Sequence, residues 1–263
     1  MVWVAGHFGE WVQGLGGPSG EVALVTLACP IKGADVTWQD APDLRVEDAS
    51  GLLDAGRAAT MLAALGVVLR GRISVAPDLS PGGGAGMSTA ALVALARAVG
   101  ASEDRIAQAC LAAEGAVDPL MLDRPDAVVW APRAAKVLTA LPPPPAATII
   151  GGFWGPPERT DANDMRFPPV GDLIAQWTLG PDLPAAAAIA TTSAERTTAL
   201  RGPSGDPTAA LATRLGALGW ARSHTGPARA LVFSPDDVPT GAEAALTQAG
   251  FTDVFSFKTG GRP

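Results

Sequence analysis

A glycine-rich loop that runs directly into an apolar segment constrains this chain more than any other stretch. The segment "LSPGGGAGMSTAALVALARAVG" spans residues 79–100 and contains glycines at positions 82, 83, 84 and 86, followed by Ser88 and Thr89. A helix N-terminus carries unpaired N–H groups and the positive end of the helix dipole, and glycines let the backbone approach an anion closely. The stretch therefore predicts a phosphate-binding site at the start of a helix. The alternative is a plain flexible loop closed by a Ser/Thr helix cap.

Two common nucleotide-binding loops do not fit this stretch. It lacks the lysine of the G-x-x-x-x-G-K-(S/T) loop. It also lacks the G-x-G-x-x-G spacing with an acidic residue about 20 positions further on that is typical of dinucleotide-binding folds. Only the glycines would support the prediction of a nicotinamide-dependent oxidoreductase, so this class is not favoured.

Composition excludes several classes of protein. The formal net charge of −7 and the absence of a Lys/Arg block argue against nucleic-acid binding. Cys29 and Cys110 belong to no Cys/His cluster, so two buried thiols are expected rather than a zinc site or a disulfide framework. We find neither a signal peptide at the N-terminus nor an apolar run long enough to span a bilayer, and we expect a soluble, cytoplasmic protein.

Hydrophobic periodicity predicts an α+β chain in two halves. Alternating or continuous apolar runs predict strands at 2–6, 21–30, 35–39, 44–48, 72–78, 148–154, 229–234 and 253–257. Helical spacing predicts helices at 52–69, 88–99, 103–114, 172–178, 185–200 and 241–250, and another that has Asp206 as N-cap and Pro207 as its first residue. The polyproline stretch "LPPPPAA" at 141–147 is the best linker candidate, so we expect domains at 1–140 and 148–263.

The glycine loop resembles the phosphate loop of the GHMP kinases, the superfamily that includes galactokinase, homoserine kinase and mevalonate kinase. That loop has the pattern P-x-x-x-G-L-G-S-S-A-A, and Ala85-Gly86-Met87 stand where it has G-L-G. Residues 86–89 can also be aligned with the family pattern if one residue is deleted, so the alignment of the loop with that pattern is open by one position. The remaining positions that match without gaps are Pro81, Ser88, Thr89, Ala90 and Ala91.

Three further stretches resemble one branch, the L-threonine kinases associated with cobalamin synthesis and propanediol utilisation. "GHFGEWVQG" at 6–14 is similar to the opening G-x-x-G-E-L-(I/V)-Q-G of that branch. "AAEGAVDPLML" at 112–122 resembles its E-P-(S/T)-D segment with one extra residue between Glu114 and Asp118. "GALGWARSHTGPARALVF" at 216–233 resembles its G-A-x-G-V-x-x-A-H-S-G-(S/T) stretch. The similarity follows the same order over most of the chain.

The resemblance implies the two-domain GHMP kinase fold, with an N-terminal half like domain 2 of ribosomal protein S5 and a C-terminal ferredoxin-like half. It also implies ATP on the glycine loop and Mg²⁺ held by Ser88 and Glu114. Hard cations prefer such oxygen ligands, although Glu114 could equally be a solvated helix end. The implied nucleotide-binding residues are Pro81, Gly82, Gly83, Gly84, Ala85, Gly86, Met87, Ser88 and Thr89.

Asp118 matches the catalytic aspartate that accepts the hydroxyl proton in the family, and the alternative is an ordinary turn residue before Pro119. If Asp118 were turned away, the proton would pass to the phosphate itself. His7 stands where the threonine-kinase pattern has a small residue. The family pattern implies two groups of substrate-binding residues, with a hairpin-shaping or loop role as the alternative. These are Gly9, Glu10, Gln13 and Gly14, and then Ser223, His224, Thr225 and Gly226.

The function predicted on this basis is ATP-dependent phosphorylation of the hydroxyl of L-threonine or of a related hydroxy amino acid or alcohol. The expected partner is that small molecule, with no nucleic acid and no membrane, and the prediction is compatible with a homodimer. The alternative is a non-catalytic protein of the same fold that binds a nucleotide or another ligand. The departures from the G-L-G and A-H-S-G patterns favour that alternative.

Overall fold

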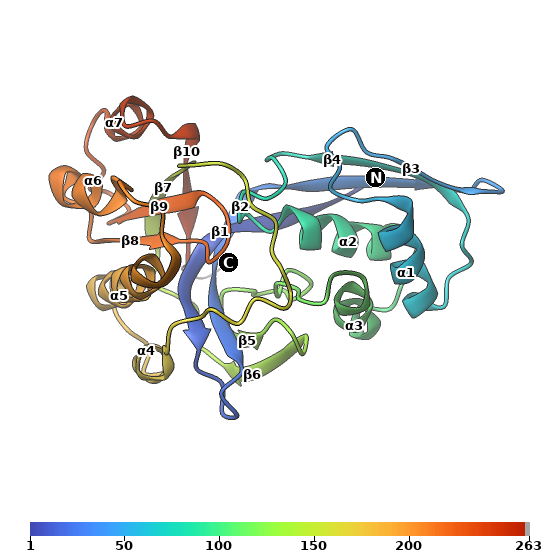
Figure 1. Ribbon diagram of the computed structural model, residues 1–263, viewed down its shortest axis with the longest axis horizontal. Helices are drawn as coiled ribbons and strands as arrows, with labels where there is room; N and C mark the ends of the chain where they lie inside the picture. The colour runs from blue at the N-terminus through green and yellow to red at the C-terminus, as the bar shows by residue number, and fades with distance from the viewer. Residues whose placement is uncertain (261–263) are drawn as a thin grey trace.

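The strands of the computed structural model, which describes residues 1–260, form one connected sheet through both halves of the molecule (Figure 1). Their order is β10-β7-β9-β8-β1-β2-β4-β3, and the hairpin of β5 and β6 is attached to β2. All pairings between these strands are antiparallel except that of β3 with β4. The strands are β1 (Val2–Leu15), β2 (Val22–Gln39), β3 (Leu44–Glu47), β4 (Gly71–Pro77), β5 (Val128–Ala131), β6 (Lys136–Ala140), β7 (Ala147–Phe153), β8 (Gly219–Arg222), β9 (Ala228–Phe233) and β10 (Thr252–Thr259).

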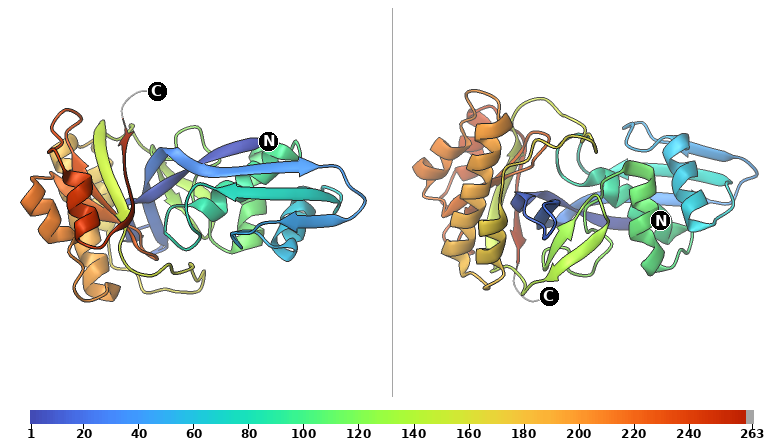
Figure 2. Two further views of the ribbon diagram at one scale, coloured as in Figure 1. Left: turned by 90° about the horizontal axis from the view of Figure 1, so that it is seen from above. Right: turned by 60° about the horizontal axis from the view of Figure 1, so that its bottom comes forward.

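The helices gather in two groups, one in each half (Figures 1 and 2). The helices are α1 (Ala55–Leu65), α2 (Met87–Ala98), α3 (Glu103–Glu114), α4 (Gly171–Trp177), α5 (Leu183–Arg201), α6 (Thr208–Leu215) and α7 (Ala242–Gln248). In one group α2 packs against β1, β2 and β4, with α1 and α3 beside it. In the other group α5, α6 and α7 pack against the part of the sheet built from β7 to β10, and α4 and α5 pack against β1. The mixture of helices with a mainly antiparallel sheet confirms the α+β class.

Strands β1 and β2 are much longer than their sequence patterns predict. The predicted strands at 21–30 and 35–39 are parts of a single strand, β2. Register shifts between Ala5 and Gly6, between His7 and Glu10, and between Glu10 and Val12 interrupt the pairing of β1 with β2. Such irregularities bend a strand and increase its twist. After the bend, Glu10 pairs with Arg222 of β8, which connects the two halves of the sheet.

Other predictions agree with the structure more closely. The helices predicted at 88–99 and 103–114 are α2 and α3, within one residue at each end. The predicted N-cap of α6 is wrong by one residue, because Pro207 occupies the cap position and Asp206 Oδ1 accepts a hydrogen bond from Thr208 N at 3.0 Å. Strands β5, β6 and β8 were not predicted, and the division into domains 1–140 and 148–263 stays a prediction.

Helix α2 is the central helix of the larger core. Nine of its twelve residues are buried, which is typical of a helix that is apolar on all sides. Its alanines allow close packing against β1 and β2. Both cysteines are buried and unpaired, as expected. Among residues 1–260, no helix has both the length and the apolar character needed to cross a bilayer.

A pair of tryptophans packs α4 against the bent strand β1, and substitution of one of them tests how much this contact stabilises the fold. Trp11 and Trp177 are both buried, with ring centroids 5.4 Å apart. Trp177→Ala should lower the free energy of unfolding by about 3–5 kcal/mol, because it opens a cavity in the core. Leu179→Ala is the matched control, since Leu179 is 85% exposed close by, and should change it by less than about 0.5 kcal/mol. Equal effects of the two substitutions in chemical denaturation would contradict this packing role.

Candidate active site

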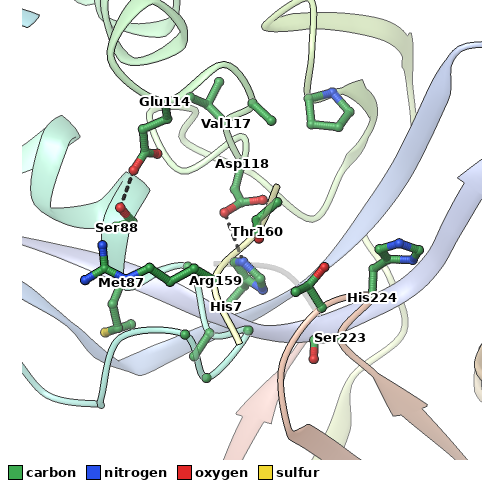
Figure 3. A pocket seen from close by; sticks show the side chains of 18 of the residues that line it. His7, Met87, Ser88, Glu114, Val117, Asp118, Arg159, Thr160, Ser223 and His224 are labelled. Carbon is green, nitrogen blue, oxygen red and sulfur yellow. Dashed lines mark hydrogen bonds and ion pairs between the residues drawn. The ribbon is translucent and has the colours of Figure 1, made fainter. Parts of the chain in front are cut away.

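A cleft of about 350 Å³ brings together residues from both halves of the chain (Figure 3). Its wall includes β1, the glycine loop, the end of α3 and the turn between β8 and β9. The segment 154–169, which connects β7 to α4, also contributes to the wall and is called the crossing segment below. The cleft is therefore formed only when the sheet is complete.

The glycine loop has the backbone geometry of an anion cradle. Gly82, Gly84 and Gly86 adopt positive φ angles of 77°, 77° and 70°, which other residues rarely adopt. Gly86 is the N-cap of α2, so the loop leads directly to the positive end of the helix dipole. Backbone hydrogen bonds hold the loop from both halves, with His7 N donating to Ala85 O at 3.2 Å and Ala228 N to Gly83 O at 2.9 Å. These hydrogen bonds hold the loop in place, so it is not a plain flexible connection.

Two predicted oxygen ligands meet at the start of α2. The hydroxyl of Ser88 donates a hydrogen bond to Glu114 Oε1 across the gap between α2 and α3. Thr89 Oγ1 lies 3.3 Å from Glu114 Oε2 and also 3.3 Å from Asp118 Oδ2. Burial raises the pKa of Glu114, while the positive charge of Arg57 and the hydrogen bond from Ser88 oppose that rise. Thr89 itself is buried behind the cleft wall, where its hydroxyl connects the two carboxylates.

The chemistry of this pair fits a divalent cation. Arg57 Nη2 donates to Ser88 Oγ at 2.7 Å and forms an ion pair with Glu114 Oε1. A cationic group therefore already lies on the two oxygens that the sequence assigns to Mg²⁺. A buried carboxylate requires such a partner, and a carboxylate and a hydroxyl are hard ligands of the kind that Mg²⁺ accepts.

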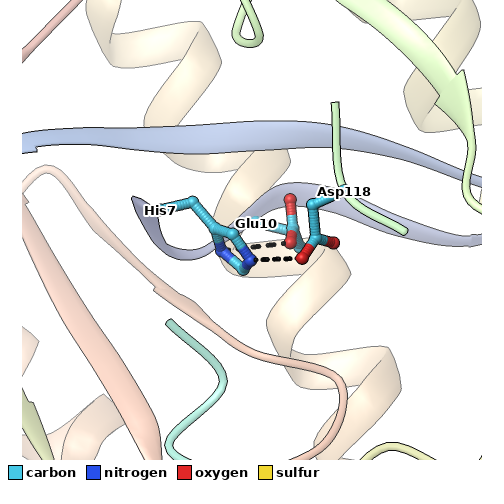
Figure 4. Close-up of side chains that lie close together, drawn as sticks. All are labelled: His7, Glu10 and Asp118. Carbon is cyan, nitrogen blue, oxygen red and sulfur yellow. Dashed lines mark ion pairs between the residues drawn. The ribbon is translucent and has the colours of Figure 1, made fainter. Parts of the chain in front are cut away.

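The ring of His7 forms ion pairs with two carboxylates, those of Glu10 and Asp118 (Figure 4). Its Nε2 is 3.1 Å from Asp118 Oδ2, and its Nδ1 is 3.4 Å from Glu10 Oε1. Burial lowers the pKa of His7, but the charges of Asp118 and Glu10 outweigh burial and raise it to about 9. Burial raises the pKa of Glu10 to about 8 against the charge of His7. Burial also raises the pKa of Asp118, but His7 outweighs it and holds that pKa below its usual value.

The turn between β8 and β9 closes the cleft from the C-terminal half. Ser223 Oγ donates to Gly226 O at 2.9 Å, which fixes the turn. His224 stacks on Phe167, with ring centroids 3.6 Å apart, and its Nε2 lies 2.6 Å from Arg201 Nη1. Burial and the charge of Arg201 lower the pKa of His224 to about 3. His224 is therefore a neutral aromatic wall of the cleft and not a cation at neutral pH.

The crossing segment reaches from the C-terminal half over the glycine loop. Glu158 N donates to Gly82 O at 2.9 Å, and Arg159 Nη2 donates to Gly51 O at 2.6 Å. Arg133 lies over the ring of Phe167, 5.3 Å from its centroid. These contacts place Glu158, Arg159, Thr160 and Phe167 in the cleft wall.

The structure brings most of the predicted site residues to this one cleft. Those that line it are Glu10, Gln13, Pro81, Gly82, Gly83, Gly84, Ala85, Gly86, Met87, Ser88, Glu114, Asp118, Ser223, His224 and Thr225. The other four lie behind the wall. Thr89 connects the carboxylates of Glu114 and Asp118. Gly9 N donates to Gly84 O at 3.2 Å, and Gly226 packs against the glycine loop. Gly14 packs against Pro168 and Val170.

Among the cleft residues that the sequence did not assign to a site are three arginines and an aromatic residue. Arg57, Arg133, Arg159 and Phe167 belong to no motif and lie far along the chain from the glycine loop or from the carboxylates. No signal in the sequence indicated Arg57 beyond its place within the predicted helix at 52–69. His7 was noticed as a departure from a family pattern, but its contact with Asp118 depends on the tertiary fold.

No protein-family profile matches the chain, and no curated protein matches it in sequence. Solved structures do match it. Mevalonate kinase of L. major, in complex with R-mevalonate, has a TM-score of 0.60 and 12% identity over 98% of this chain and 94% of that chain. Homoserine kinase of Cytophaga hutchinsonii has a TM-score of 0.58 and 15% identity over 98% and 94%. Phosphomevalonate kinase of Streptococcus pneumoniae has a TM-score of 0.65 and 9% identity over 99% and 100%. The chain therefore has the GHMP kinase fold, as predicted.

The cluster of His7 and Glu10 should make stability depend on pH. Between pH 6.5 and about 9 the folded chain keeps a proton on His7 that the unfolded chain releases, so stability falls as pH rises. Glu10 acts in the same direction between pH 4.5 and about 8, because its folded pKa is also raised. The loss from pH 6.5 to 9.5 should be on the order of 1–3 kcal/mol.

Urea denaturation at a series of pH values measures this effect. The double variant His7→Gln/Glu10→Gln lacks both titrating groups and should lose less stability over the same range. A wild-type protein whose stability rises from pH 6.5 to 9.5 would contradict the assigned ion pairs.

Proposed function

We propose that this protein is an ATP-dependent kinase that phosphorylates the hydroxyl group of a small molecule, L-threonine or a related hydroxy amino acid or alcohol. The observation that carries the proposal is the meeting of three groups in one cleft. These are the glycine cradle at the start of α2, the contact of Ser88 with Glu114, and the carboxylate of Asp118. Phosphoryl transfer requires phosphate positioning, charge neutralisation and a group that accepts a proton, and the cleft offers each.

The glycine loop would hold the polyphosphate of ATP, and Ser88 with Glu114 would hold Mg²⁺. Bound there, Mg²⁺ would neutralise charge on the phosphates. The GHMP kinase fold supports this assignment, since the phosphate loop of those kinases resembles residues 81–91. The role of each residue in this chain is part of the proposal.

Asp118 would accept the proton of the acceptor hydroxyl. His7 supports this role, because its charge keeps Asp118 ionised at neutral pH and its Nε2, 3.1 Å away, fixes the position of one carboxylate oxygen. A low pKa weakens a base, but it ensures that the carboxylate is available for the proton. Thr89 holds the same oxygen from the other side at 3.3 Å.

The choice of a hydroxy amino acid rests on the opening turn at 6–14, which resembles that of the L-threonine kinases. The structure neighbours include kinases of homoserine and of mevalonate, so this fold accepts both an amino acid and a hydroxy acid. Glu10 and Gln13 line the cleft beside Asp118, where an acceptor molecule would lie.

A panel of acceptors tests the function directly. ADP release should be measured with Mg·ATP and L-threonine, L-serine, L-homoserine, mevalonate or glycerol, and L-threonine is expected to give the highest kcat/KM. A rise in melting temperature with Mg·ATP but no ADP release with any acceptor would instead support the non-catalytic alternative. The absence of both a thermal shift with Mg·ATP and ADP release with any acceptor would overturn the proposal.

Asp118→Asn should lower kcat by about 10²- to 10⁴-fold, which is the usual contribution of a positioned general base. ATP binding should be nearly unchanged, because the substitution preserves size and lies on the acceptor side. Single-turnover transfer at saturating ATP measures the effect, and Asp123→Asn is a control with an acidic residue that does not line the cleft. A decrease in kcat smaller than about tenfold would mean that Asp118 is not the base.

Gly84→Ala should weaken nucleotide binding by more than about tenfold while the protein remains folded, because the cradle needs a positive φ and close approach. A Cβ at residue 84 would lie 2.5 Å from Ser223 Oγ and 2.6 Å from Thr225 O. Gly205→Ala is the matched control, since Gly205 has a φ of 79° and open space around it. Titration with a fluorescent ATP analogue measures both, and equal affinity of the two variants would argue against the cradle.

A further inference from the structure

Arg57 is held in the cleft by three acceptors that belong to three different segments. Its Nη2 donates to Ser88 Oγ at 2.7 Å and pairs with Glu114 Oε1, and its Nη1 donates to Leu52 O. The guanidinium plane is therefore fixed where α2 and the end of α3 meet. It is the same place that the proposed function gives to the metal ion.

The position of Arg57 on its own helix does not explain its presence. Asp54 caps α1 and accepts a hydrogen bond from Arg57 N at 2.9 Å, so Arg57 lies in the first turn. A positive side chain in the first turn opposes the helix dipole. The stabilisation of Arg57 comes instead from Glu114, whose side chain is only 10% exposed and requires a cation.

The guanidinium and a metal ion cannot use these oxygens at the same time. Both carry positive charge, and both need Ser88 Oγ and Glu114 Oε1. The Arg57 side chain is 24% exposed and lines the open cleft, so it can leave Glu114 without unfolding the core. An ion pair that served the fold alone would not need to face the cleft or to include the hydroxyl of Ser88.

We propose that Arg57 is an internal cation that competes with a metal ion for Ser88 Oγ and Glu114 Oε1 and is displaced when a metal–nucleotide complex binds. This proposal rests on the proposed function and adds a control of metal affinity to that same site. Glu114 then has a positive partner both with and without the metal–nucleotide complex. The metal must compete with the charge of Arg57 for this position.

Competition of this kind lowers the apparent affinity for the metal. If Arg57 fills the position nine-tenths of the time, the apparent dissociation constant is about tenfold weaker than that of the free site. Removing the guanidinium should therefore tighten metal binding, which is the opposite of what the loss of a phosphate-binding arginine would do.

The experiment measures Mn²⁺ binding by electron paramagnetic resonance in the presence of the β,γ-imido analogue of ATP, which needs no turnover. Arg57→Ala should bind Mn²⁺ about tenfold more tightly than the wild type. Arg159→Ala is the matched control, because Arg159 lines the same cleft and donates to Gly51 O instead. A general effect of charge in the cleft would tighten Mn²⁺ binding equally in both variants and would overturn the proposal.

Chemical rescue gives a second readout. Guanidinium chloride at a non-denaturing concentration should weaken Mn²⁺ binding to Arg57→Ala back towards the wild-type value, whereas sodium chloride at the same ionic strength should not. If Arg57→Ala fails to fold because Glu114 is left unpaired, Arg57→Gln retains hydrogen-bond donors without the charge and should show the same tightening.

The outcomes distinguish the role of Arg57 from the proposed kinase function. Mn²⁺ binding that is unchanged or weaker in the Arg57 variants, with normal binding in the wild type, would overturn the role of Arg57 alone. An absence of Mn²⁺–nucleotide binding in the wild type and in every variant would overturn the proposed function, and the role of Arg57 with it.

Discussion

Three carboxylates that are withdrawn from water around one cleft are the constraint on which the site depends. Glu10, Glu114 and Asp118 belong to β1, to the end of α3 and to the segment that follows α3, and each needs a positive or hydrogen-bonding partner. His7 supplies that partner for Glu10 and Asp118, and Arg57 supplies it for Glu114. The hydroxyl of Thr89 lies between Asp118 and Glu114 and joins the two ion-pair systems.

The fold provides these partners through the bend of β1. Its irregular pairing with β2 brings His7 close to Glu10, with His7 Nδ1 3.2 Å from Gly9 O and His7 Nε2 3.1 Å from Asp118 Oδ2. The backbone of the same bend fastens the glycine loop, because His7 N and Gly9 N donate to Ala85 O and Gly84 O. One distortion in one strand therefore positions both the candidate base and the phosphate cradle. The Trp11 and Trp177 rings behind it keep β1 against α4.

The proposed chemistry makes different electrostatic demands on two neighbouring carboxylates of the cleft, which the hydroxyl of Thr89 joins. Asp118 must be an ionised carboxylate free to accept a proton, and His7 ensures the ionised state. Glu114 would exchange one cation for another, and its partner Arg57 is 24% exposed and lines the cleft. The crossing segment adds Arg159 beside the glycine loop, so part of the positive charge of the cleft comes from a side chain that no local motif contains.

The sequence by itself determined the local features of this protein. The four glycines within residues 82–86, followed by an alanine-rich run, predicted a cradle and a helix, because backbone freedom and helix propensity are local properties. The order of the matching stretches predicted the GHMP kinase fold, which the solved structures confirm. The site residues named from those stretches mostly reach one cleft, although their roles stay proposals.

Only the tertiary structure decided which charges meet. Arg57 is 57 residues from Glu114, and His7 is more than a hundred residues from Asp118, so their pairing depends on how α1, α3 and β1 pack. The lengths of β1 and β2 also escaped prediction, since their continuation depends on partner strands from both halves of the sheet. An ion pair over such separations has no periodicity and no motif, because its physical cause is the shared burial of two side chains and not their order along the chain.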